Sequence, residues 1–120
     1  MSIAPEAFLT SAEPLAHRPE EIDRRNCISR AYYFAYHAAQ RRAVELGRGI
    51  FADVPTHEAV IQAFTTWTAK PDAIKVGVLL RDMKKRRVLA DYLLKMDLEA
   101  SLTTLQLGTA NKVRTLLATL

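Results

Sequence analysis

Hydrophobic residues recur along this chain at the spacing of amphipathic helices, and breaks in the pattern divide it into five segments. The first covers about residues 4–15, and the AHRP run at 16–19 ends it, because proline disfavours helix at the residue before it. The second begins near Pro19 and runs to the LGRG sequence at 46–49, with acidic residues in its first turn where they complement the helix dipole. It is predicted to be a long helix, followed by a loop at 49–55.

Three further segments continue the pattern. Thr56 is of the residue type that caps helices and begins the third, THEAVIQAFTTW, which Lys70-Pro71 closes. The fourth runs from about residue 72 to 95 with Gly77 as a weak point, and the fifth from 97 to 120, interrupted by Gly108. Their apolar stripes are Val76, Leu79, Met83, Ala90 and Leu94, and then Leu98, Leu102, Leu105, Val113, Leu116 and Leu120. Together the segments predict one domain, residues 1–120, folded as an all-α up-and-down bundle of four to five helices.

Composition supports a helical protein and narrows its class. Alanine, leucine, arginine, lysine and glutamate dominate, while β-branched residues are thinly spread. Cys27 is the only cysteine, so we expect no internal disulfide. The N-terminal stretch lacks the pattern of a signal peptide, and no apolar run reaches the roughly 18–20 residues that span a bilayer. We therefore expect a cytoplasmic protein without membrane contact.

The charge pattern indicates either an anionic partner or an ordinary solvated surface. Net charge is +4, and the RDMKKRR run at 81–87 holds five of the seventeen lysines and arginines. Such a patch can bind nucleic acid or an acidic protein, or it can be a solvated helix face. No histidine lies with cysteines or carboxylates at metal-ligand spacing, and no glycine-rich phosphate loop is present, so we expect neither metal nor other cofactor.

The second segment has two helical faces of different character. One carries Ile28, Ala31, Tyr32, Ala35 and Ala39, and the other Asn26, Arg30, Tyr33, Phe34, His37 and Arg41. Arg30 and His37 point the same way, about 10 Å apart along the axis. A face that mixes charges with aromatics is expected to meet a second subunit, a nucleic acid, or another helix carrying an acid. In the alternative interpretation, Arg30 pairs with Asp82 or Asp91 inside the bundle, and His37 caps a helix or bonds a carbonyl.

Two arginines interrupt the apolar stripe of the fourth segment. Arg87 and Asp91 are four residues apart and can pair on the helix surface. Arg86 has no acid at position 90, so it must extend to solvent, reach an acid on another helix, or face a ligand. Of the other histidines, His17 is expected in a loop, and His57 is expected to be solvated or capping.

Three motifs resemble those of prokaryotic HEPN domains: SRAYYFAYHAA at 29–39, HEAVIQAF at 57–64 and RRVLADY at 86–92. The resemblance implies a four- or five-helix bundle, commonly a homodimer, in a superfamily rich in toxin–antitoxin, phage-defence and RNA-cleaving proteins. Many members are metal-independent ribonucleases whose signature is an arginine followed, after four to six residues, by a histidine. Arg30 and His37 satisfy that spacing. In those ribonucleases the signature lies in a late helix, where this chain has Arg86 and, in place of the histidine, Asp91.

The resemblance leaves more than one function open. In a metal-independent endoribonuclease, His37 would transfer protons, and Arg30 or Arg86 would stabilise the developing phosphorane charge. Alternatively, the protein is a non-catalytic module that holds RNA, a nucleotide or a partner protein such as a nucleotidyltransferase antitoxin, or a purely structural dimer. The expected binding residues are Tyr33, Arg86, Arg87, Asp91 and Tyr92.

Overall fold

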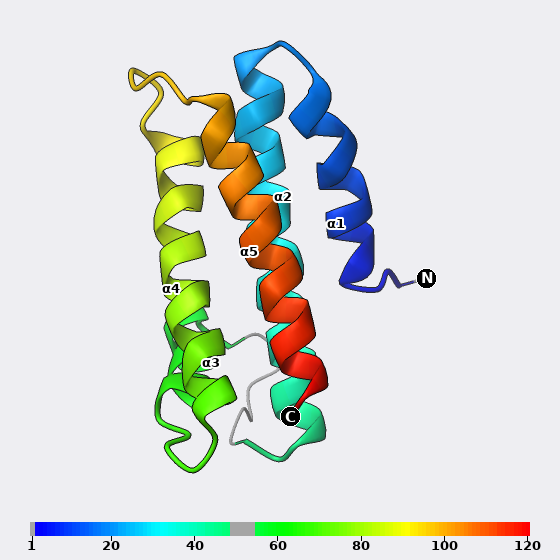
Figure 1. Cartoon of the computed structure of the whole chain (residues 1–120), viewed down its shortest axis with the longest axis vertical. Helices are drawn as coiled ribbons and strands as arrows, with labels where there is room; N and C mark the ends of the chain where they lie inside the picture. The colour runs from blue at the N-terminus through cyan, green and yellow to red at the C-terminus, as the bar shows by residue number, and fades with distance from the viewer. Residues whose placement is uncertain (1, 49–54) are drawn as a thin grey trace.

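The computed structural model describes residues 2–48 and 55–120, and this part of the chain is helical with connecting turns. Its elements are α1 (Glu6–Ala12), the 3-10 helix η1 (Glu13–His17), α2 (Glu21–Glu45), α3 (His57–Thr65), α4 (Pro71–Tyr92) and α5 (Ala100–Ala118). Figure 1 shows α1, α2, α4 and α5 running alternately up and down, with the short α3 beside the lower end of α4. The predicted all-α up-and-down bundle is confirmed. The predicted loop at 49–55 lies, except for residue 55, outside the described residues.

Local signals place most helix ends within a few residues of the expected positions. Helix α2 starts at Glu21, after Pro19, and ends with Gly47 in the left-handed region at φ 68°. There the N–H of Arg48 donates to the carbonyl of Ala43 (2.9 Å) and the N–H of Gly47 to that of Val44 (3.1 Å), which is a Schellman motif. At α3, the Thr56 hydroxyl accepts a hydrogen bond from the backbone N–H of Ala59 (3.1 Å), so the predicted cap is confirmed.

Helix α2 is the central element of the bundle, because α1, α4 and α5 all pack against it. The predicted small-residue face, from Ile28 to Ala39, is buried as expected. Phe34 lies on the opposite helical face, and it too is buried, with only 1% of its surface exposed. Neighbouring helices on several sides therefore bury a wider part of α2 than one stripe.

The last two helices differ from their predicted stripes. Helix α4 ends at Tyr92, and Leu94 lies beyond it and is exposed. In α5, Leu105 is exposed, whereas Thr103, Gln106 and Thr109 are buried. The polar residues face inward because they bond across or along the helices, which a hydrophobic pattern does not register.

The two helical glycines are not equivalent. Gly77 lets α3 approach α4 closely, because a Cβ at this position would lie 2.8 Å from the backbone nitrogen of Thr65 and would also overlap its side chain. Gly77 is therefore a packing contact and not a weak point. Gly108 faces open space, and α5 passes through it without interruption.

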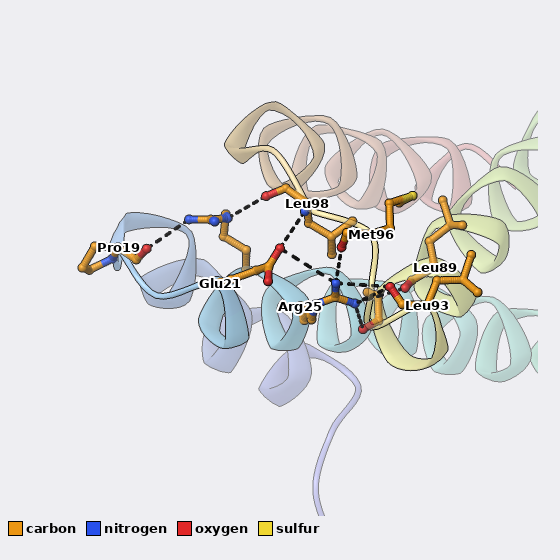
Figure 2. Close-up of polar contacts among 9 residues, drawn as sticks. Pro19, Glu21, Arg25, Leu89, Leu93, Met96 and Leu98 are labelled. Atoms are coloured by element: carbon orange, nitrogen blue, oxygen red, sulfur yellow. Dashed lines mark hydrogen bonds and ion pairs between the residues drawn. The ribbon is translucent and has the colours of Figure 1, made fainter.

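The end of α4 is fixed by Arg25, a buried arginine of α2. Its guanidinium donates to four backbone carbonyls, those of Leu89, Ala90, Leu93 and Met96 (Figure 2). The hydrogen bond to Ala90 is 2.9 Å long. Carbonyls at the end of a helix lack partners within the helix and attract cations. Arg25 therefore acts as a C-terminal cap supplied by another helix.

Neighbouring side chains connect the same point to the start of α5. The Glu21 carboxylate lies 3.8 Å from the Arg25 guanidinium and accepts a hydrogen bond from the backbone N–H of Leu98 (2.8 Å; Figure 2). The Nε of Arg24 donates to the carbonyl of Leu98 (2.9 Å), and its Nη1 to that of Pro19 (3.1 Å). The first turn of α2 thus holds both sides of the α4–α5 connection.

Replacing Arg25 is expected to destabilise the fold strongly. Arg25→Leu removes the donor of the Ala90 and Met96 carbonyls, whereas those of Leu89 and Leu93 keep backbone N–H donors. We expect the free energy of unfolding to fall by about 3 kcal/mol in urea denaturation followed by circular dichroism. Arg24→Leu is the matched control, because it removes bonds to only two carbonyls in more exposed surroundings; its expected loss is about 1 kcal/mol. Equal losses in the two variants would contradict the capping role of Arg25.

Candidate functional site

Tyr33 is the centre of the candidate site, on a part of α2 that contacts both α1 and α4. Its half-buried ring lies 6.3 Å from the ring of His37 on the same helix. The guanidinium of Arg87, from α4, lies over it at 5.7 Å from the ring centroid. The ring of His57, from α3, meets it edge-on at 6.2 Å. We call these four residues, Tyr33, His37, His57 and Arg87, the Tyr33 cluster.

His37 is positioned by α1. Its ring stacks on Phe8 at 5.3 Å between centroids and an angle of 17°. His37 also lines a pocket of about 610 Å³ together with Phe8, Gln40 and Arg41. Burial lowers the pKa of His37, and its hydrogen bond with Gln40 offsets part of this effect. His37 is therefore neutral at pH 7 and able to accept a proton.

His57 is the residue of this site that sequence reasoning missed. It was expected to be solvated or capping, but its ring stacks on Tyr36 at 4.3 Å, and its Nδ1 lies 2.7 Å from the hydroxyl of Tyr32. Burial lowers the pKa of His57, as do the charges of Arg87 and Lys84. A signal was present, because position 57 falls on the buried stripe of α3 with 60, 61 and 64.

Arg87 brings together most of the residues expected to bind a ligand. It forms the predicted ion pair with Asp91 at 3.4 Å, and its guanidinium also lies 5.9 Å from the ring centroid of Tyr92. The Asp91 carboxylate also accepts a hydrogen bond from the hydroxyl of Ser29 (3.2 Å). Tyr33, Arg87, Asp91 and Tyr92 thus form one continuous surface across α2 and α4.

Arg30 lies on the same face of α2 but does not pair with Asp82 or Asp91. Its guanidinium is exposed and donates to the hydroxyl of Ser11 on α1 (2.7 Å). The alternative in which Arg30 pairs with an aspartate is therefore wrong, and Asp91 is held instead by Arg87 and Ser29. Of the three partners left open for this face, another helix carrying an acid is present: Glu6 of α1 pairs with Arg41 at 2.6 Å.

Arg86 points away from the Tyr33 cluster and toward α5. Its Nε donates to the side-chain oxygen of Gln106 (2.6 Å), and its Nη2 lies 3.3 Å from the Thr109 hydroxyl. Gln106 in turn donates to the carbonyls of Ile28 and Met83, which ties α2, α4 and α5 together. Burial lowers the pKa of Arg86. Its hydrogen-bond partners among the described residues are neutral acceptors of α5, not carboxylates.

A metal site and a cysteine nucleophile find less support among the described residues. Within 2–48 and 55–120, no group of three histidine, cysteine or acidic residues is placed to hold a metal ion. Cys27 is buried, and burial raises the pKa of its thiol to about 11, so it is not a nucleophile at neutral pH. His17 is exposed at the end of η1. None of the described helices is both long and apolar enough to cross a membrane.

Comparison of the chain with protein-family models, with curated proteins and with solved structures returned no match.

The half-buried imidazole of His57 should make stability depend on pH. Because its pKa is lowered in the folded state, the neutral form stabilises the fold above the unfolded value near 6.5, and this contribution is lost as pH falls. We expect the free energy of unfolding to decrease between pH 7.5 and pH 5.5, and His57→Asn to reduce this decrease. His17→Asn, which changes an exposed histidine, should leave it intact. Urea denaturation at both pH values measures the effect, and an identical pH dependence in His57→Asn would contradict it.

Proposed function

We propose that the protein binds single-stranded RNA, as a HEPN-like homodimer, on the α2 face that carries Arg30 and the Tyr33 cluster. One observation supports this most directly: the half-buried ring of Tyr33 has both a cation, the guanidinium of Arg87 at 5.7 Å, and a second ring, the imidazole of His37 at 6.3 Å, beside it. Proteins that bind single-stranded nucleic acid combine aromatic rings, on which bases stack, with cations that contact phosphates. The Tyr33 cluster contains both kinds of group.

Cations without carboxylate partners flank the cluster. In the basic segment of α4, Arg81 pairs with Glu58 and Arg87 with Asp91, but Lys84 makes no ion pair with the described residues. Lys84 lies close enough to His57 to lower the pKa of that imidazole. On the α2 side, the partner of Arg30 within the described part of the chain is the neutral hydroxyl of Ser11. Phosphates can replace these weak contacts at small cost, because a charge-assisted bond is stronger than a neutral one.

The resemblance to HEPN domains supports the same function. Its motif at 29–39 carries Arg30, Tyr33 and His37, and its motif at 86–92 carries Arg87, Asp91 and Tyr92. A two-fold dimer would present two copies of this face, and together they would contact a longer RNA strand than one copy does. The alternative partner is a protein such as a nucleotidyltransferase antitoxin, which would cover the same residues without RNA.

Binding should depend on Tyr33 through stacking and on Arg30 and Lys84 through charge. With a short single-stranded RNA and fluorescence anisotropy, we expect Tyr33→Leu to weaken binding about tenfold, while Tyr33→Phe, which keeps the ring, binds almost normally. Arg30→Gln and Lys84→Gln should each lower the slope of log K against log salt concentration by about 0.7. Lys75→Gln, which removes an exposed lysine near the other end of α4, is the control and should change neither quantity.

Two results would contradict RNA binding at the Tyr33 cluster. If Tyr33→Leu binds as tightly as the unchanged protein, or if Lys75→Gln lowers the salt slope as much as Arg30→Gln, the Tyr33 cluster is not the RNA surface.

RNA cleavage is a second candidate function, favoured by the state of His37. A neutral imidazole beside a pocket can take the proton of a 2′-hydroxyl group, and the exposed Arg30 guanidinium on the same helix face can stabilise charge on phosphorus. As in the HEPN ribonucleases that the sequence resembles, these two residues would act without a metal. His57 is a less suitable base, because its Nδ1 is already engaged by Tyr32.

Cleavage should therefore persist in EDTA and depend on His37. We expect His37→Gln to lower the rate at which a labelled RNA is cleaved at least about a hundredfold, the usual contribution of a general base. His17→Gln controls for loss of a histidine elsewhere and should retain full activity. If the unchanged protein leaves RNA intact, or His37→Gln cleaves it equally fast, the catalytic role fails while RNA binding is judged separately by the Tyr33 variants.

A further inference from the structure

A second cavity lies among α1, α2 and α5. Its volume is about 510 Å³, and three arginines line it: Arg41 and Arg42 from α2 and Arg114 from α5. Its apolar wall consists of Phe34, Ala38 and Leu117, which expose little surface, and of Ala118, which is exposed. The cavity thus combines a concentration of guanidinium groups with a surface suited to an organic group.

The cations of this cavity are incompletely neutralised. Glu45 pairs with Arg42 at 3.0 Å, and Glu6 pairs with Arg41. Arg114 makes no ion pair with the described residues, and its Nη2 donates to the side-chain oxygen of Asn111 (2.6 Å). The Nε of Arg42 is buried without a hydrogen-bond partner in the described chain. The Nε atoms of Arg48 and Arg87 are in the same state elsewhere in the bundle, and the Nε of Arg42 is the one of the three that belongs to a residue lining this cavity.

Glu6 lies where an incoming anion would be held. Its hydrogen bond with Arg41 lowers the pKa of its carboxyl group, and the charge of Arg114 contributes in the same direction. One carboxylate thus lies in the field of arginines from two different helices. About half of each side chain in the Glu6–Arg41 pair is exposed, so water weakens the pair.

We propose that this cavity binds a phosphate monoester, a small organic molecule whose phosphate displaces the Glu6 carboxylate from Arg41 and Arg114. With Glu6 displaced, Glu45 is the remaining acid in the lining of the cavity, opposite three arginines. Arg42 also donates to the carbonyl of Leu120 (2.6 Å), so Arg41 and Arg114 have the more available donors. The resulting excess of two positive charges matches a phosphate monoester, which carries about −1.5 to −2 at pH 7. Guanidinium groups bind phosphate oxygens in pairs of parallel hydrogen bonds, and the organic part would lie against the apolar residues of the lining, of which Ala118 is exposed.

The phosphate site and the RNA surface can be tested separately, because different residues belong to each. Arg41 lines both this cavity and the pocket of His37, so a change at Arg41 would not distinguish the two. We call the cavity among α1, α2 and α5 the arginine cavity. Arg114, on α5, lines the arginine cavity but not the pocket of His37, and Tyr33 lines neither. Arg114 variants therefore report on the phosphate site alone.

Titration of the full chain with phenyl phosphate, followed by isothermal calorimetry, tests the proposal. Arg114→Gln should weaken binding about tenfold, the effect of losing one charge-assisted hydrogen bond. Glu6→Gln removes the internal competitor and should strengthen binding several-fold. Lys112→Gln removes an exposed cation of α5 that does not line the cavity, and should leave the affinity unchanged. Thermal unfolding without ligand verifies that each variant is folded.

Two further ligands distinguish the contribution of the phosphate group from that of the ring. Phenol, which lacks the phosphate, should not bind, and inorganic phosphate, which lacks the ring, should bind more weakly than phenyl phosphate. The proposal is overturned if neither the unchanged protein nor Glu6→Gln binds phenyl phosphate at millimolar concentration, or if Lys112→Gln weakens binding as much as Arg114→Gln. Equal affinity for inorganic and phenyl phosphate would also overturn it, because the apolar wall would then have no role. Tyr33→Leu should bind phenyl phosphate normally whatever its effect on RNA.

Discussion

The guanidinium of Arg25 beneath the end of α4 is the interaction on which the rest of the structure depends. A buried cation is costly unless its donors are satisfied, and here they are used by helix-end carbonyls that would otherwise lack partners. The guanidinium thus supplies donors to the carbonyls, and the carbonyls offset the free-energy cost of burying its charge. Because Arg25 bonds the carbonyl of Ala90, it also fixes how α4 lies against α2, and Arg87, one turn earlier, is brought over the ring of Tyr33. The candidate site thus depends on a contact outside it.

Consecutive arginines in α4 serve different neighbours because adjacent helical positions differ by about 100°. Arg86 turns toward Gln106 of α5, whereas Arg87 turns toward the tyrosines of α2. The basic segment is consequently neither a uniform nucleic-acid patch nor a plain solvated face. Arg86 and Arg87 stabilise helix packing, and Lys84 makes no ion pair with the described residues. This division explains how one segment can support both the fold and the proposed RNA surface.

Local patterns in the sequence predict the elements but not the partners of its polar groups. The small residues from Ile28 to Ala39 and the Thr56 cap depend on spacings of a few residues, and both were predicted correctly. Arg25 and Gln106 bond carbonyls more than twenty positions away, which no periodicity encodes. The only signal for them was a polar residue on a buried stripe. For Arg30, several acids were within plausible reach, and only the packing of α1 selects the hydroxyl of Ser11.

Helix α1 separates the two surfaces to which functions are assigned. Its Phe8 contacts His37 on the side of the Tyr33 cluster, and its Glu6 enters the arginine cavity near α5. The position of α1 does not depend on those contacts alone, because Leu9 and Ala12 are buried against the core. Burial of apolar surface contributes more to stability than an exposed ion pair. Glu6 can therefore release Arg41 to a ligand without detaching α1, and the polar edges of this helix can exchange partners while its apolar face holds it in place.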